Sequence, residues 1–219
     1  LYIGTDNSLL VLNSKYEVLF RFDDIGAVRS IAFDKNGVCV LGTSKNGVYV
    51  LDKDYHLKNI GIKEGLPSLS ETNVFEFNGQ LFLTTDIGFY EFNNDFSGVL
   101  KSNQFNIKNG WVVNHAVQIG KQIWFQSSVK DKVKVRIEEI SVFEKNKNEF
   151  SLVKTYLSRI QNADVKHFYK DSDHILISTN QGLYSYELNK YQSPKKFNVV
   201  LSKINFEGDS IHSFENYTS

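Results

Sequence analysis

The sequence predicts an all-β fold of repeated antiparallel sheets, and three observations lead to this prediction. Aromatic residues are abundant, with 17 Phe and 11 Tyr among 219 residues, whereas Pro is scarce at 2. Together with many Val, Ile and Thr residues, this composition favours strands over helices. A strand–turn–strand pattern recurs along the chain, and its turn residues recur with it. No segment shows the apolar period of a sustained helix.

The recurring pattern is an apolar strand, a pair of small or polar residues, a short polar turn and a second strand. Its five copies are LYIGTDNSLLVLN (1–13), VCVLGTSKNGVYVLD (38–52), LFLTTDIGFYEFN (81–93), IWFQSS with ISVFEK (123–128 with 140–145) and ILISTNQGLYSYELN (175–189). Equivalent positions in these copies are Gly4, Gly42, Thr84, Gln126 and Ser178, which gives intervals of 38, 42, 42 and 52 residues. Such regular spacing indicates one structural unit that is repeated.

The second copy shows how many strands each unit holds. We predict strands over 28–33, 38–43, 48–52 and 56–62. Asn-Gly pairs at 36–37 and 46–47 separate the first three of these strands, and such pairs supply the positive φ angles that tight hairpin turns need. Four short antiparallel strands in roughly 42 residues are typical of a β-propeller blade.

The remaining units follow the same scheme. Residues 1–24 supply three strands, complete blades are expected over 28–62, 72–107 and 112–157, and a last blade begins at Asp164 and ends near Tyr191. We therefore predict a β-propeller segment of about four to five four-stranded antiparallel blades. Because the first unit lacks an inner strand before Leu1, we expect a larger ring of about seven blades, with the earlier blades upstream.

The longest interval contains an insertion, VKDKVKVRIEE (129–139). Val133, Val135 and Ile137 alternate with basic residues there, so we predict that the insertion lengthens both strands of the fourth hairpin. The resulting basic ribbon could bind a partner, or it could be a solvated edge that its charge keeps soluble.

Charge and cysteine content exclude several classes of protein. Lys plus Arg and Asp plus Glu both number 25, so nucleic-acid binding, which normally needs a basic surplus, is not expected. Cys39 is the single cysteine, so no intrachain disulfide can form. No apolar run reaches the roughly 18 residues of a membrane span, and we expect any membrane anchor to lie outside this chain.

No catalytic residue, metal site or cofactor is assigned. Cys39 stands between two valines and is expected to be a buried structural residue. No Gly-x-Ser-x-Gly motif is present, and the five histidines lack zinc-type spacing. The stretch Asp171-Ser172-Asp173-His174 carries potential metal ligands, but it stands where a blade needs a turn, which is the interpretation we favour. Paired carboxylates for glycoside hydrolysis would meet through space, so the sequence leaves them open.

A ligand-binding segment is the better candidate for function. NGWVVNH (109–115) begins a blade, and inner strands start near the funnel of a propeller, where ligands often bind. Sugars stack their C–H faces on aromatic rings and need amides or carboxylates for their hydroxyls. Trp111, Asn114 and His115 are therefore the candidate ligand-binding residues. The alternative is that Trp111 packs between blades and that Asn109-Gly110 forms a turn.

The segment KEGLP (63–67), followed by the strands over 72–93, resembles the two-component regulator propeller repeat. That repeat pairs a Gly-Leu-Pro entry with a later hairpin of the form lWiGT-x-x-Gl-x-x-y. The hairpin is matched imperfectly at 2–5, 40–43 and 179–184, and one copy carries Gly-Leu-Pro. The tryptophan of the family is kept as Trp124 and replaced in three other copies by Tyr2, Cys39 and Phe82.

The chain changes character after Pro194. The stretch KKFNVVLSKINFEGDSIHSFEN (195–216) is similar to the opening strands of the three-tyrosine domain, a small β-sandwich that follows such propellers. In this comparison Val199, Leu201 and Ile204 lie in one strand, and residues 207–209 form its turn. The resemblance implies propeller blades over 1–193 and the start of a three-tyrosine-type β-sandwich over 194–219.

This resemblance implies a sensor. Such propellers form the periplasmic input region of membrane-anchored histidine kinases, often hybrid kinases of Bacteroidetes, and they detect oligosaccharides. The implied partners are an oligosaccharide or another small-molecule ligand, and a second copy of the protein that is bound through the downstream domain to give a homodimer. Two alternatives remain, which are a propeller-fold enzyme that degrades polysaccharides and a propeller scaffold that docks other proteins.

Overall fold

The structure is a computed structural model. It describes residues 1–105, 111–130, 136–146, 149–156 and 165–188, and the short strands at 199–200, 204–206, 209–211 and 216–217. The chain divides into two compact units, Leu1–Tyr186 and Glu187–Ser219, and each is described by itself. No membrane-spanning helix is found in the part of the chain that the structure describes.

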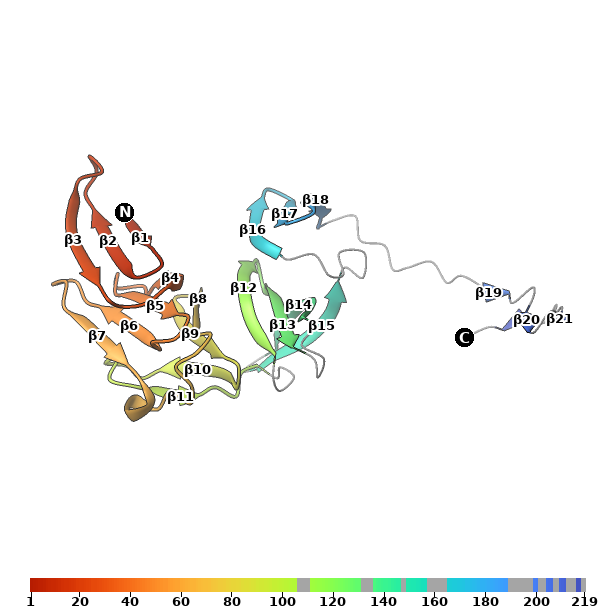
Figure 1. The fold of residues 1–219 in the computed structure, drawn as a ribbon, viewed down its shortest axis with the longest axis horizontal. Coiled ribbons are helices and arrows are strands. Elements are labelled where there is room, and N and C mark those ends of the chain that lie inside the picture. Colours follow the sequence, from red (N-terminus) through yellow and green to blue (C-terminus); the bar gives the residue numbers. More distant parts are fainter. Residues whose placement is uncertain are drawn as a thin grey trace. The chain divides into compact units, whose positions relative to one another are not determined.

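The described residues of the first unit form five antiparallel sheets, which can be followed from red to blue in Figure 1. The first sheet holds β1 (Tyr2–Gly4), β2 (Ser8–Leu12) and β3 (Val18–Asp23), and the second holds β4 (Val28–Phe33), β5 (Cys39–Thr43), β6 (Val48–Leu51) and β7 (Leu57–Ile60). The third sheet holds β8 (Asn73–Phe77), β9 (Gln80–Thr85), β10 (Gly88–Phe92) and β11 (Val99–Lys101), and the fourth holds β12 (Val112–Ile119), β13 (Gln122–Lys130), β14 (Arg136–Asn146) and β15 (Glu149–Tyr156). The fifth sheet holds β16 (Val165–Asp171), β17 (His174–Thr179) and β18 (Gly182–Glu187).

The predicted all-β class is confirmed. In each of these five sheets the strands lie in chain order and pair antiparallel with their neighbours, so each sheet is a meander of consecutive strands. Between the second and third sheets the chain forms one short 3₁₀ turn, η1 (Ile62–Glu64). The insertion lengthens the fourth hairpin as predicted, because β13 has 9 residues and β14 has 11. The tip of this hairpin, at 131–135, lies outside the described residues.

Consecutive sheets pack face to face through apolar clusters. One cluster joins Leu9 and Val11 of the first sheet to Leu41 and Leu51 of the second. A second cluster contains buried side chains of the second and third sheets, and another contains buried side chains of the third and fourth sheets. Eight of the ten buried residues in the third cluster are phenylalanines, and Phe105 packs on Phe150 with ring centroids 4.4 Å apart. The high aromatic content of the sequence therefore fills the spaces between sheets.

The repeated small-residue pair has a structural cause. A Cβ atom on Gly42 would lie 2.5 Å from the Thr72 carbonyl oxygen, so the close approach of the next sheet requires glycine there. Thr43 then holds the following turn, since its hydroxyl donates to the Gly47 carbonyl at 2.8 Å and accepts from the Asn46 N–H at 2.9 Å. Threonine hydroxyls at positions 5, 85 and 179 accept backbone N–H bonds in the equivalent turns.

The Asn-Gly and Gly-Leu-Pro motifs also have identifiable roles. Gly37 and Gly47 have positive φ angles of 85° and 73°, while their preceding asparagines do not, so the glycine alone supplies the left-handed residue in these turns. Gly65 ends η1 with φ 94°, which turns Leu66 into the cluster between the second and third sheets, where it is 1% exposed.

The described residues of the second unit form two short antiparallel pairs. In one pair β19 (Val199–Val200) bonds to β22 (Asn216–Tyr217), and in the other β20 (Ile204–Phe206) bonds to β21 (Asp209–Ile211). The predicted domain boundary at 193/194 and the predicted strand residue Leu201 lie outside the described residues, as do Glu207 and Gly208 of the predicted turn. The three-tyrosine-type β-sandwich therefore stays a prediction.

Candidate functional site

One arginine joins the first strands of three consecutive sheets. Arg29 lies near the start of β4, and its Nη1 is 2.9 Å from Oε2 of Glu71, which precedes β8. Its Nε donates to Oδ1 of Asn73 in β8, and its Nη2 donates to Oδ1 of Asn114 in β12, each at a distance of 3.4 Å. We call Arg29, Glu71, Asn73 and Asn114 the first-strand network.

Further bonds hold the two amides of this network in place. The Asn73 amide donates to the Val113 carbonyl at 3.0 Å, and this side chain is buried, with the residue 1% exposed. The Asn114 amide donates to the Ser128 hydroxyl at 2.9 Å and is half-buried. Asn73 therefore positions its neighbours, whereas Arg29, Glu71 and Asn114 present a guanidinium, a carboxylate and an amide that solvent can reach.

β-Bulges place part of this network. In β4, Val28 pairs with Thr43 and Ser30 pairs with Gly42, which leaves Arg29 as the extra residue. The same irregularity occurs at the equivalent point of β12, between Val113 and His115, and of β16, between Val165 and His167. The extra residues there are Asn114 and Lys166. A bulge disrupts the ladder locally and re-aims a side chain, so the polar residues at these three positions share a structural cause.

Of the three predicted ligand-binding residues, the structure places one, Asn114, in the first-strand network. Asn114 belongs to the first-strand network, whereas the sequence did not single out Arg29, Glu71 or Asn73. Trp111 directly precedes β12 and is half-buried, and His115 is the half-buried residue in β12 that pairs with Gln126. The one sequence signal that could have revealed the network is position, because Arg29, Asn73 and Asn114 stand at the starts of predicted blades and Glu71 directly precedes one. The ligand-binding role of Trp111, Asn114 and His115 stays a prediction.

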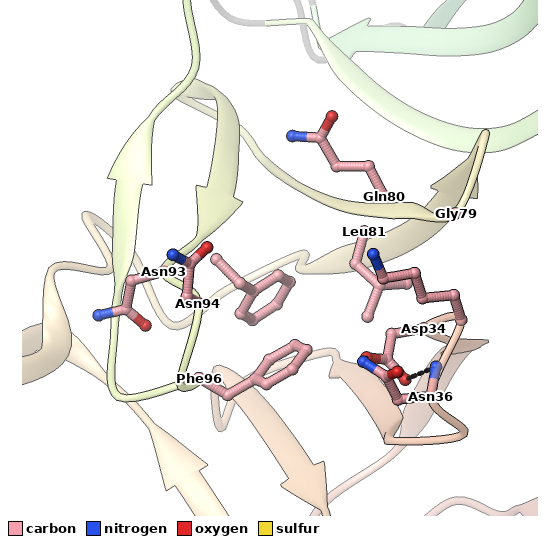
Figure 2. A pocket seen from close by; sticks show the side chains of 10 residues that line it. Asp34, Asn36, Gly79, Gln80, Leu81, Asn93, Asn94 and Phe96 are labelled. Carbon is pink, nitrogen blue, oxygen red and sulfur yellow. Dashed lines mark hydrogen bonds between the residues drawn. The ribbon is translucent and has the colours of Figure 1, made fainter.

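A pocket of about 180 Å³ lies at the other ends of β4 and β8 (Figure 2). Its walls come from the β4–β5 turn (34–36), from residues 79–81 at the β8–β9 turn and from the β10–β11 connection (92–96). The residues at the pocket comprise an apolar set, four amides, one carboxylate and one ammonium: Leu81, Phe92, Phe96, Asn36, Gln80, Asn93, Asn94, Asp34 and Lys35, with Gly79. Figure 2 shows the Phe96 ring between Asn94 and the Asp34–Asn36 turn. No sequence pattern indicated this pocket.

Cys39 is confirmed as a buried residue, 1% exposed. Desolvation raises the pKa of its thiol to about 12, so the reactive thiolate is absent at neutral pH. The arrangement therefore gives Cys39 a packing role and not a nucleophilic one.

Asp52, Asp54 and His56 lie together, with one potential ligand atom of each within 4.8 Å of the others. Asp52 Oδ1 accepts the backbone N–H groups of Asp54 and His56, at 2.9 and 2.8 Å. Asn13 makes the equivalent pair of bonds in the first sheet, to the N–H groups of Lys15 and Glu17. Since an uncharged amide does the same work there, the cluster is a repeated turn.

The Asp171–His174 stretch is also a turn, as favoured from the sequence. Asp171 pairs with His174 at the end of the β16–β17 hairpin, and Ser172 between them has a positive φ of 52°. His174 Nδ1 lies 2.7 Å from Asp173 Oδ1, so the imidazole is already engaged within the turn.

Comparisons with known proteins bear on the fold. No family model matches the sequence, and no curated protein sequence matches it. The structure is similar to the extracellular domain of a proposed hybrid two-component system from B. thetaiotaomicron, with a TM-score of 0.54 and 16% identity over 93% of this chain and 32% of that one. It is also similar to an auxiliary nutrient binding protein from Bacteroides ovatus, with a TM-score of 0.53 and 12% identity over 84% of this chain and 53% of that one.

The likeness is one of fold. The chain spans about a third of the length of the first of these proteins and about half of the second. At such low identity the comparisons carry no residue assignments. The resemblance of residues 63–67 and 72–93 to the two-component regulator propeller repeat stays a prediction, because no family model matches.

Proposed function

We propose that this chain is part of the ligand-sensing, extracytoplasmic region of a two-component regulator, and that it binds an oligosaccharide at the first-strand network. The observation that carries the proposal is the Arg29–Glu71–Asn114 arrangement, in which a guanidinium, a carboxylate and an amide from three neighbouring sheets are fixed within one network. Sugar hydroxyls both donate and accept hydrogen bonds, so a site with donors and acceptors held at set positions suits them.

The fold proposed with this function is a β-propeller segment of four to five blades within a larger ring of about seven blades, which continues into a β-sandwich. The face-to-face packing of consecutive four-stranded meanders supports it. So does the structural similarity to an extracellular domain of a two-component system and to a nutrient binding protein. The first of these neighbours is an extracellular domain and supports an extracytoplasmic location, which we propose is the periplasm.

The network is better suited to binding than to hydrolysis. Glycoside hydrolysis uses two carboxyl groups as acid and as base or nucleophile, and the network contains one, Glu71, held by Arg29. A guanidinium stays protonated at physiological pH, so Arg29 cannot exchange a proton with a substrate. We therefore favour a sensor over a polysaccharide-degrading enzyme.

The signalling mechanism we propose is a shift between two arrangements of a homodimer that is formed through the downstream domain. An oligosaccharide that binds one arrangement more tightly increases its population by that difference in affinity. A histidine kinase beyond this chain would read the change.

Calorimetric titration of the 219-residue chain with oligosaccharide fractions of plant and host polysaccharides tests the proposal. We expect one fraction to bind and Arg29→Ala to lose about tenfold or more in affinity, since a hydrogen bond from a charged group contributes roughly 1.5–3 kcal/mol. Asn114→Ala should lose about three- to tenfold, since a hydrogen bond from a neutral amide contributes roughly 0.5–1.5 kcal/mol. Arg21→Ala is the matched control, because Arg21 is an exposed arginine on β3 that pairs with Asp23. The absence of binding at millimolar concentrations, or equal losses in all three variants, would refute the proposal, and release of reducing ends would favour the enzyme.

A further inference from the structure

We propose that the pocket in Figure 2 is a second binding site, which takes a single neutral sugar residue. The first-strand network lies at the starts of β4 and β8, whereas the pocket lies at the turns that follow these two strands. The proposal therefore goes beyond the function proposed above and does not depend on it.

The three walls of the pocket are fixed by local hydrogen bonds and turn geometry. Asp34 Oδ1 accepts the backbone N–H groups of Asn36 and Val38, at 2.9 and 2.8 Å, which sets the β4–β5 turn. In the β8–β9 turn both central residues, at 78 and 79, have positive φ angles of 53° and 77°, as a two-residue hairpin requires. Asn93 Oδ1 accepts the Gly98 N–H at 2.9 Å and sets the β10–β11 connection. The pocket is thus formed before any ligand arrives, which lowers the entropic cost of binding.

The pocket contains an aromatic residue whose counterparts occur in the equivalent connections of two other sheets. Asn13, Asp52 and Asn93 each begin the connection between the last two strands of a sheet, and an aromatic residue with positive φ follows three residues later: Tyr16, Tyr55 and Phe96. Tyr55 is covered by the preceding sheet, because its ring stacks on Phe20 with centroids 4.1 Å apart and an interplanar angle of 19°.

The equivalent cover is missing from Phe96. Phe20 pairs with Val11, and the corresponding pairing in the second sheet joins Lys58 to Val50, so Lys58 occupies the position of Phe20. Lys58 Nζ donates to the Phe96 carbonyl oxygen at 3.4 Å, a contact that involves the backbone and not the ring. The Phe96 ring lies instead against Phe92 of its own sheet, with centroids 5.5 Å apart, and both rings border the pocket.

The chemistry of the lining matches a sugar ring. Leu81, Phe92 and Phe96 offer apolar surface for the C–H face of a pyranose, and the amides of Asn36 and Asn94 offer donors and acceptors for its hydroxyls. Gln80 borders the pocket with its backbone, since its side-chain amide donates to Oε2 of Glu91 at 2.9 Å. The lining carries one carboxylate and one ammonium, from residues 34 and 35, so its formal charges cancel and a neutral sugar is favoured. The volume of about 180 Å³ is below the usual range of drug-sized sites, which suits one residue and not a chain.

Nuclear magnetic resonance of the ¹⁵N-labelled 219-residue chain tests this site, with the methyl glycosides of glucose, galactose and mannose as probes. We expect at least one probe to cause saturable shifts of the backbone amides of Asn36, Gln80 and Asn94 and of the side-chain amides of Asn36 and Asn94, with a millimolar dissociation constant. Asn94→Ala should weaken binding about three- to tenfold, as the loss of one hydrogen bond predicts. Phe96→Ala should abolish binding.

Two controls separate this site from the first-strand network and from general effects on folding. Lys53 follows Asp52 as Asn94 follows Asn93, so Lys53→Ala is the matched exposed substitution and should leave binding unchanged. Arg29→Ala should also leave it unchanged, whatever that variant does to oligosaccharide binding. The inference is overturned if none of the three glycosides gives saturable shifts at tens of millimolar, or if the shifts survive Asn94→Ala and disappear in Arg29→Ala.

Discussion

The Thr72 hydroxyl provides a direct test of how the second sheet is tied to the third. Thr72 is fully buried and precedes β8. Its Oγ1 accepts the Thr43 N–H at 2.8 Å, and its single hydrogen is shared between the carbonyl oxygens of Thr43 and Gly47, which lie 2.8 and 2.7 Å from Oγ1. Thr72→Val keeps the shape of the side chain and removes all three interactions.

The loss in free energy of unfolding for Thr72→Val depends on the hydrogen bonds that the partners of Thr72 keep. Each partner keeps another bond: the Thr43 N–H still reaches the Gly47 carbonyl at 3.1 Å, the Thr43 carbonyl still accepts the backbone N–H of residue 72 at 3.1 Å, and the Gly47 carbonyl still accepts the Thr43 hydroxyl at 2.8 Å. No buried group is left wholly unpaired, so the loss is about 1 kcal/mol for donation and about 1 kcal/mol for acceptance. We expect Thr72→Val to lower the free energy of unfolding by about 2 kcal/mol.

Urea denaturation measures this difference. With a slope of about 2 kcal/mol/M, the midpoint of Thr72→Val should fall by about 1 M. Thr72→Ser is the matched variant, since it keeps the hydroxyl and loses one methyl group, which costs about 1 kcal/mol. If Thr72→Val proved as stable as Thr72→Ser or more stable, packing and not hydrogen bonding would hold this junction.

Two further predictions concern the core and the pH dependence. Phe105→Ala should lower the free energy of unfolding by about 3–5 kcal/mol, because its buried ring contacts rings of the third and fourth sheets. Leu100→Ala, at a residue 72% exposed, should change it by less than about 0.5 kcal/mol, and similar effects of the two substitutions would contradict the assigned core. Hydrogen bonding from the His56 backbone N–H lowers the pKa of Asp52, so its contribution to stability is present above the unfolded-state pKa and is lost as pH falls through the lower folded-state value. The melting temperature of the native chain should therefore drop relative to Asp52→Asn below about pH 4, and a difference independent of pH would argue against this.

Local sequence signals were enough to predict the strands and turns. The strand predicted over 28–33 is β4, with the same bounds, because alternating apolar residues and flanking turn residues act over a few positions. The φ angles of Gly37 and Gly47 likewise follow from the residues themselves. The lengthened fourth hairpin was predictable for the same reason, since its alternation continues through the insertion.

The candidate sites depend on contacts that no local signal reports. Asn114 was predicted from its residue type and place, but Arg29 reaches it across 85 residues of sequence and reaches Asn73 across 44. The bulge that makes Arg29 an extra residue in β4 is a property of the pairing with β5 and not of the sequence of β4 alone.

The sequence by itself therefore determined the all-β class, the repeated unit and the turn chemistry, because these rest on backbone preferences and on the period of a single strand. The tertiary structure alone decided which polar groups meet and where a pocket forms. Phe96 illustrates the reason. Its counterpart Tyr55 is covered by Phe20, whereas Lys58 stands at the position of Phe20 in the second sheet. That the Phe96 ring is left without this cover is visible only once the neighbouring sheets are packed together.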